Sequence, residues 1–158
     1  MAFSDEMIGT VVKVGRISDP AAERHLATVL MQRRDSIGRA YYTAINPLVD
    51  FALSADGTLD FANEAARSGV VPDAATGYRA TWARFDNATG VATPVGEATS
   101  ASDTRLTLPG ALPTHEDAYV QVEIAATSAA HPAWQVPVRV HFRRAAGAWK
   151  LVGVRRAA

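Results

Sequence analysis

The spacing of apolar side chains changes once along the chain, from a helical period in the first third to alternation in the remainder. In the first segment, Met7, Val11 and Val14 recur at helical spacing. Ser4 is placed to cap such a helix, and Gly15 is placed to end it. The pattern therefore predicts a short amphipathic helix between these two residues.

A second and longer apolar stripe follows at helical spacing. Its members are Leu26, Val29, Leu30, Ile37, Tyr41 and Ile45. Asp19 or Ser18 is suited to cap this helix, with Pro20 at its first position. Pro47 ends it, because the residue before a proline disfavours the helical conformation. The segment is one long helix, or two helices broken near Gly38.

From residue 49 onward, apolar and polar residues alternate with the period of two that is typical of strands. Residues 51–61 predict a hairpin that turns at Asp56 and Gly57. "NEAARSG" then predicts a single helical turn capped by Asn63. Six to eight short strands are expected in all, and because few helices separate them, the sheets should be mostly antiparallel. The later strand-like segments are "YRATWARF", "VATPVGEA", "TRLTL", "AYVQVEIAA", "VPVRVHFRR" and "WKLVGVRR".

Helices followed by many short strands predict an α+β protein. We expect a helical lead-in over residues 1–48, packed on a mostly antiparallel β-sandwich over residues 49–158, together forming one compact unit. The sandwich would be of the immunoglobulin or fibronectin-III type. The alternative is a cone-shaped α+β barrel with the helices in front of a curved sheet. That fold would end in the same hairpin, but it usually needs fewer and longer strands.

Composition narrows the possible chemistry mainly by exclusion. A chain of 158 residues that is 48% apolar can bury a core without help from metals or disulfides. The absence of cysteine excludes disulfides, thiolate nucleophiles and zinc–thiolate sites. It fits the cytoplasm without excluding the periplasm. No apolar run reaches the length of a membrane-spanning helix, so we expect a soluble chain without a transmembrane segment.

The sequence contains no recognisable catalytic, nucleotide or metal motif. The four histidines are scattered and fall at His25, His115, His131 and His141. We therefore predict no catalytic residue, no metal ligand and no cofactor. An alternative is a small-molecule binder or small enzyme with a pocket between helices and sheet. Besides a histidine, its lining would draw on Tyr41, Tyr42, Trp82 and Trp134.

Charge is unevenly distributed although the net charge is zero. Residues 131–158 contain six basic side chains and no acidic one, whereas residues 51–130 are rich in carboxylates. A basic face on the last strands is one candidate for binding anionic surfaces. Cross-strand pairing, with Glu123 as a partner, is the simpler interpretation. Overall neutrality argues against nucleic acid as a partner. The candidate basic residues are Arg139, His141, Arg143, Arg144 and Lys150.

The densest polar chemistry lies in "RRDSIGRAYY" on the long predicted helix. Arg33, Ile37 and Tyr41 fall on one helical face. A glycine in a helix interior favours close approach by another segment. The stretch is therefore predicted to be a packing seam between helix and sandwich, with a ligand site as the alternative. Its candidate interface residues are Arg33, Arg34, Asp35, Gly38, Arg39, Tyr41 and Tyr42.

Three phrases carry a resemblance: "ISDPAAERHLATVLMQRRDSIGRAYYTAINPL", "ARFDNATG" and "HPAWQVPVRVHFRRAAGAWKLVGVRR". They resemble the C-terminal region of large, uncharacterised bacterial proteins, in which an RRD-x-IGR helix precedes a β-rich ending. The resemblance implies a C-terminal module and brings no assigned activity. Together with the residue patterns, it predicts a non-catalytic accessory or interaction domain whose partners are other domains of a parent chain or another protein.

Overall fold

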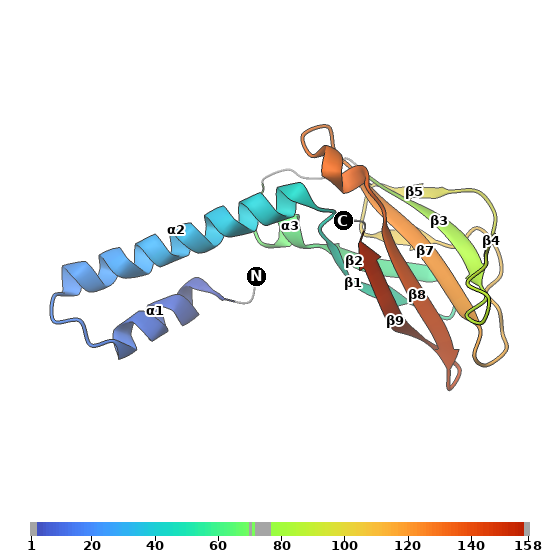
Figure 1. The fold of residues 1–158 in the computed structure, drawn as a ribbon, viewed down its shortest axis with the longest axis horizontal. Helices are drawn as coiled ribbons and strands as arrows, with labels where there is room; N and C mark the ends of the chain where they lie inside the picture. The colour runs from blue at the N-terminus through green and yellow to red at the C-terminus, as the bar shows by residue number, and fades with distance from the viewer. Residues whose placement is uncertain (1–2, 70, 72–76, 157–158) are drawn as a thin grey trace.

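The structure is a computed structural model that describes residues 3–69, 71 and 77–156. Two helices come first, and strands make up most of the remaining chain, which is the predicted order (Figure 1). The elements are α1 (Asp5–Val14), α2 (Pro20–Ala44), β1 (Leu48–Leu53), β2 (Thr58–Asn63), α3 (Glu64–Arg67), β3 (Gly77–Phe85), β4 (Ala92–Pro94), β5 (Thr99–Ala101), β6 (Arg105–Thr107), β7 (Tyr119–Thr127), the 3-10 helix η1 (Pro132–Gln135), β8 (Val138–Ala145) and β9 (Ala148–Arg156).

The strands form two antiparallel sheets. The smaller sheet has the order β1-β2-β6, and the larger has the order β4-β3-β7-β8-β9, with β5 also paired to β3. Every strand pair of the described residues is antiparallel. The α+β class with antiparallel sheets is therefore confirmed. Neither sheet closes on itself within these residues, so the cone-shaped barrel is wrong.

Local signals place the element ends where the sequence predicts them. The Ser4 hydroxyl accepts a hydrogen bond from the Met7 amide, at 3.2 Å, and caps α1. Asp19 caps α2 through the Ala21 amide, at 2.8 Å. Gly57 has a φ of 87°, which a glycine adopts without strain, and it allows the tight turn between β1 and β2. These are short-range effects, which explains why sequence alone locates them.

The core lies between the two sheets and is made by the inward residues of each strand. β7 and β8 contribute alternating aliphatic residues, and β1 and β2 face them with larger side chains. Trp134 of η1 closes one end of this core and is fully buried. The main members of the core are Leu48, Phe51, Leu59, Phe61, Trp82, Val122, Ile124, Val138, Val140 and Phe142.

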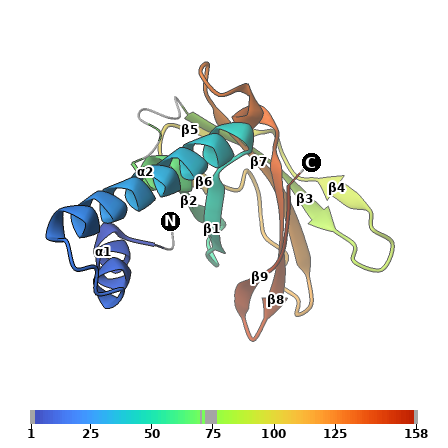
Figure 2. The same ribbon diagram turned by 60° about the vertical axis from the view of Figure 1, so that its left-hand side comes forward.

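The first two helices form an arm that projects from the sheets (Figures 1 and 2). α2 is continuous through Gly38, so the two-helix alternative is wrong. α1 packs along α2, and α2 reaches α3 and η1 near its C-terminal end. The predicted seam between this helix and the sandwich is wrong for Ile37 and Tyr41, because these side chains are 70% and 58% exposed. They lie on the arm, on a face that the sheets do not cover.

Three smaller features differ from the expectation. The sequence pattern does not predict β5, because its residues, "TSA", are small and include only one apolar side chain. The connection between β7 and β8 contains η1. The strand-like segment "VPVRVHFRR" is predicted from residue 136, but β8 begins at Val138, and Val136 is 44% exposed.

Candidate functional site

α2 carries two adjacent stripes of side chains along its length. One stripe is half-buried or buried, and it includes Ala27, Met31 and Gly38. α1 lies along α2 and buries Val12. The other stripe consists of Leu26, Leu30, Ile37 and Tyr41, all of which are exposed.

The open stripe borders a groove with a volume of about 570 Å³. Phe3, which precedes α1 and is itself more than half exposed, lies across the groove from the α2 residues. α1 also leaves the side chains of Met7, Val11 and Val14 exposed. The groove is lined by Phe3, Leu30, Arg33, Arg34, Ile37, Gly38, Tyr41 and Tyr42.

Arg34 fastens the beginning of the chain to α2. Its guanidinium donates to Asp35 Oδ1 through Nε at 2.9 Å and to the Phe3 carbonyl through Nη1 at 2.9 Å. Nη2 also forms an ion pair with Asp5 Oδ1 at 2.7 Å. The hydrogen bonds to Asp35 and Asp5 raise the pKa of Arg34 above that of a free arginine. Arg34 therefore shapes one wall of the groove, and its charge is already neutralised.

Arg33 differs from its neighbour in both position and pairing. It stands between Leu30 and Ile37 on the open stripe and lines the groove beside Phe3. It also lines a second hollow formed with Val29, Gln32, Ser36 and Ile37. Within the described ranges the Arg33 side chain makes no ion pair, although it is exposed. The guanidinium of Arg33 therefore lies among apolar side chains without an ion-pair partner from the described residues.

The remaining candidate residues of "RRDSIGRAYY" differ in burial and in their partners. Gly38 is buried within α2, and Asp35 is half-buried and engaged by Arg34. Tyr41 and Tyr42 stack edge to face with ring centroids 5.7 Å apart. Burial and the nearby Glu64 carboxylate raise the pKa of the Tyr42 phenol. Arg39 lies on the exposed surface of α2.

The junction where α2 meets the sheets is tightly hydrogen-bonded. The Trp134 indole donates to the Tyr42 carbonyl at 2.6 Å, which satisfies a backbone acceptor at the helix end. Asn46 is buried, and its Nδ2 lies within 3.2 Å of the carbonyls of Ile124, Trp134 and Val136. One asparagine side chain thus connects the end of α2 to β7 and to the segment around η1.

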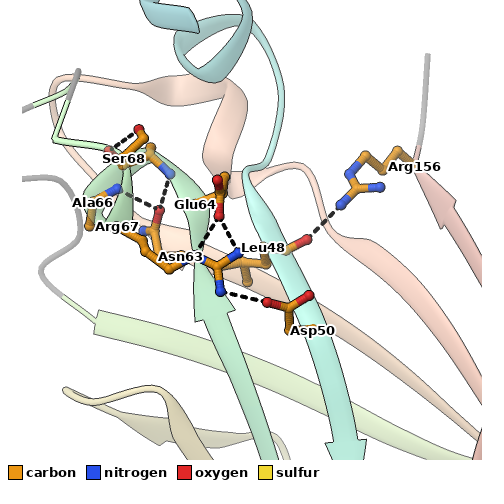
Figure 3. A network of polar contacts seen from close by, with 9 residues as sticks. Leu48, Asp50, Asn63, Glu64, Ala66, Arg67, Ser68 and Arg156 are labelled. Carbon is orange, nitrogen blue, oxygen red and sulfur yellow. Dashed lines mark hydrogen bonds and ion pairs between the residues drawn. The ribbon is translucent and has the colours of Figure 1, made fainter. Parts of the chain in front are cut away.

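A second set of polar contacts holds β1 beside the last strand and α3 (Figure 3). Arg156 of β9 donates through Nη2 to the Leu48 carbonyl at 2.6 Å. Arg67 bridges Glu64 Oε2, at 2.7 Å from its Nε, and Asp50 Oδ2, at 2.6 Å from its Nη1. These contacts hold β1, which follows α2 in the chain, beside β9 and α3. The sequence pattern does not reveal Asn46 or Arg156, because their acceptors are backbone atoms distant in the chain.

No family model, no curated protein and no solved structure matches this chain.

The candidate basic face is largely neutralised by neighbouring strands. Arg139 donates to Glu123 Oε1 from Nε at 2.8 Å, as cross-strand pairing predicts, and Arg143 pairs with Asp117 at 2.6 Å. His141 lies beside Gln121 Oε1, at 3.2 Å. Burial and the adjacent Arg139 lower the pKa of His141.

Of the two remaining candidates, Lys150 lies on this face and Arg144 does not. Arg144 follows Arg143 in β8 and so points to the opposite side of the sheet, where its guanidinium lies 5.9 Å from the Trp149 ring centroid. Lys150 is exposed opposite Arg143. Carboxylates therefore neutralise Arg139 and Arg143 on this face, whereas Lys150 adds a further positive charge beside Arg143.

The aromatic residues predicted to line an internal pocket do not share one: Tyr41 and Tyr42 line the groove on the arm, whereas Trp82 lines a separate hollow. Trp82 is buried and donates to Thr99 Oγ1 at 2.9 Å, and Trp134 fills the core. Tyr41 is on the arm. A different hollow of about 750 Å³ lies at the ends of β3 and β7, beside Phe85, Asp86 and His115. Asp86 there accepts hydrogen bonds from the turn amides that follow it, which is a structural role.

Two further findings concern the described residues. They contain no group of three or more histidine, aspartate or glutamate side chains arranged to hold a metal ion. Nor does any helix among them combine the length and apolar character needed to cross a bilayer. The apolar groove on the arm is the candidate functional site.

Proposed function

We propose that this chain is a non-catalytic interaction module, the C-terminal part of a larger bacterial protein, and that the α1–α2 arm is its docking element. The observation that carries the proposal is the open stripe of α2. A helix that presents an apolar stripe normally buries it against another element. Here one stripe of α2 is covered by α1, and the adjacent one remains exposed in the groove beside Phe3.

The rigid junction supports the same function. An arm that presents a surface to a partner gains affinity when its direction is fixed before binding. The bonds from Trp134 and Asn46 supply that fixation at the end of α2. Contiguous exposed apolar surface is unusual in a monomeric protein and typically marks an interaction site.

Photo-crosslinking in the producing cells tests this function. A photoreactive amino acid at position 37 should give a discrete adduct, whereas one at position 91, an exposed apolar position near β4, should not. Added wild-type chain should compete for the adduct, and the Ile37→Asp/Tyr41→Asp variant should not. The absence of an adduct, or equal competition by the double variant, would show that the arm is not the docking element.

We also propose that the sandwich is of the immunoglobulin or fibronectin-III type. Its support is a pair of antiparallel sheets in which β2 lies beside β6 and β3 lies beside β7, so that the chain crosses between sheets. An experimental structure tests the assignment through strand order. An order without Greek-key crossovers would exclude it.

A further inference from the structure

The open stripe on α2 has one charged member, and this member indicates what kind of partner fits. Leu26, Leu30, Ile37 and Tyr41 are spaced so that one position of the stripe falls on Arg33. Arg33 lines the hollows on both sides of it. Any segment that covers the apolar residues also covers the Arg33 side chain.

Covering a cation has an electrostatic cost that depends on what lies opposite. A buried charge is tolerated when an opposite charge pairs with it and is strongly unfavourable when left alone. Two carboxylates of the arm, Asp5 and Asp35, already bind Arg34, and no carboxylate of the described residues pairs with Arg33. The partner must therefore supply the missing acid for Arg33.

A second copy of the chain fits this requirement poorly. The midpoint of the stripe between Leu26 and Tyr41 falls beside Arg33. Two α2 helices packed antiparallel through this stripe would place the two Arg33 side chains near the two-fold axis, where like charges repel. A different protein segment, with a carboxylate among its apolar residues, complements the surface instead.

We propose that the groove binds an amphipathic helix of a partner protein that carries an aspartate or glutamate in the middle of its apolar face, opposite Arg33. This inference rests on the proposed docking function and adds the chemical class of the partner. The stripe from Leu26 to Tyr41 is roughly 22 Å long at the rise of an α-helix, which corresponds to a partner helix of about four turns. The guanidinium of Arg33 would form the bidentate carboxylate pair for which arginine is suited.

Designed peptides test the charge preference directly. The probes are fluorescein-labelled amphipathic helices of about four turns, with leucines on one face and glutamate, glutamine or lysine at the central position. Fluorescence anisotropy with the full chain should show the glutamate peptide binding about tenfold or more tightly than the lysine peptide. Arg33→Glu should reverse this order. Arg24→Glu, an exposed arginine of the same helix that lies off the stripe, is the matched control and should keep it.

Each other outcome has a distinct meaning. Equal binding of the three peptides, sensitive to Ile37→Asp, would overturn the acidic partner while leaving the docking function intact. If Arg24→Glu and Arg33→Glu have equal effects, the preference for the glutamate peptide is a general charge attraction. That result would also overturn the acidic partner. A dimer in sedimentation that dissociates on Ile37→Asp would identify a second copy as the occupant. Binding of no peptide, with no adduct in the crosslinking experiment, would overturn both proposals.

Discussion

The arm and the sandwich use the same kinds of residue in opposite ways. In the sandwich, the inward-facing side chains of both sheets are withdrawn from water, and Phe142 and Trp134 are fully buried, although Leu151, Val152 and Val154 of β9 are partly exposed. On the arm, Ile37 and Tyr41 are as apolar or aromatic as those residues and remain mostly in solvent. The buried side chains therefore stabilise the sandwich without a partner, whereas the arm exposes apolar surface that does not stabilise its fold.

Polar groups show a parallel contrast. At the junction, Asn46 is buried and each of its side-chain polar atoms lies within hydrogen-bond distance of backbone groups. On the arm, Arg33 is exposed and makes no ion pair with the described residues. An arm that binds a partner needs a junction whose polar groups are hydrogen-bonded. It also needs a binding face whose charged group is still without a partner. Substitutions that separate folding from binding test this contrast.

The largest expected effect is in the core. Trp134→Ala should lower the free energy of unfolding by about 3–5 kcal/mol, because it opens a cavity and removes the hydrogen bond to Tyr42. Ile37→Ala, its counterpart on the arm, should change it by less than about 0.5 kcal/mol. Urea unfolding measures both. A loss of several kcal/mol on Ile37→Ala would mean that the exposed stripe stabilises the fold and is not reserved for a partner.

The next effect is at the junction. Asn46→Ala leaves backbone groups around β7 and η1 without their side-chain partner, so it should cost about 1–3 kcal/mol. Asn87→Ala, in the exposed turn after β3, is the matched control and should be nearly neutral. Both are measured by urea unfolding. If Asn46→Ala leaves stability unchanged but raises amide exchange at the end of α2, the residue directs the arm without stabilising the sandwich.

The features of the fold that could be predicted from the sequence are those that depend on residues close together in the chain. The caps at Ser4 and Asp19, the turn at Gly57 and the alternation along β7 and β8 each depend on residues a few positions apart. They therefore appear in the chain as local patterns. The α+β class follows from their order.

The direction of the arm was not predictable in the same way. An amphipathic stripe shows which side of a helix is apolar, but it does not show whether anything covers that side. The long helix is therefore expected to pack its Arg33–Ile37–Tyr41 face on the sandwich, whereas that face is open. Helical spacing places Arg33 on the apolar face, but it does not show which of Arg33 and Arg34 has an ion-pair partner. Only Arg34 meets Asp5, because the turn between the helices brings α1 back along α2.

The smallest expected effect concerns pH and lies in the sandwich. His141 packs edge to face on Phe85, with ring centroids 4.7 Å apart, and its pKa is lowered from 6.5 by burial and by Arg139. Because the folded pKa is the lower one, the unfolded chain binds more protons between the two values. The stability linked to His141 is therefore complete above about pH 6.5 and decreases as the pH falls through the folded pKa.

His141→Gln should consequently lose less stability than the wild type when urea unfolding is compared between neutral pH and about pH 5. His25→Gln removes an exposed histidine of α2 and should retain the wild-type pH dependence. If His25→Gln reduces the pH dependence instead, the acid-sensitive histidine is on the arm, and the arm contributes to folding stability in a way that its exposure does not indicate. If neither variant changes the dependence, carboxylates alone account for it, and the packing of His141 against Phe85 leaves both protonation states equally stable.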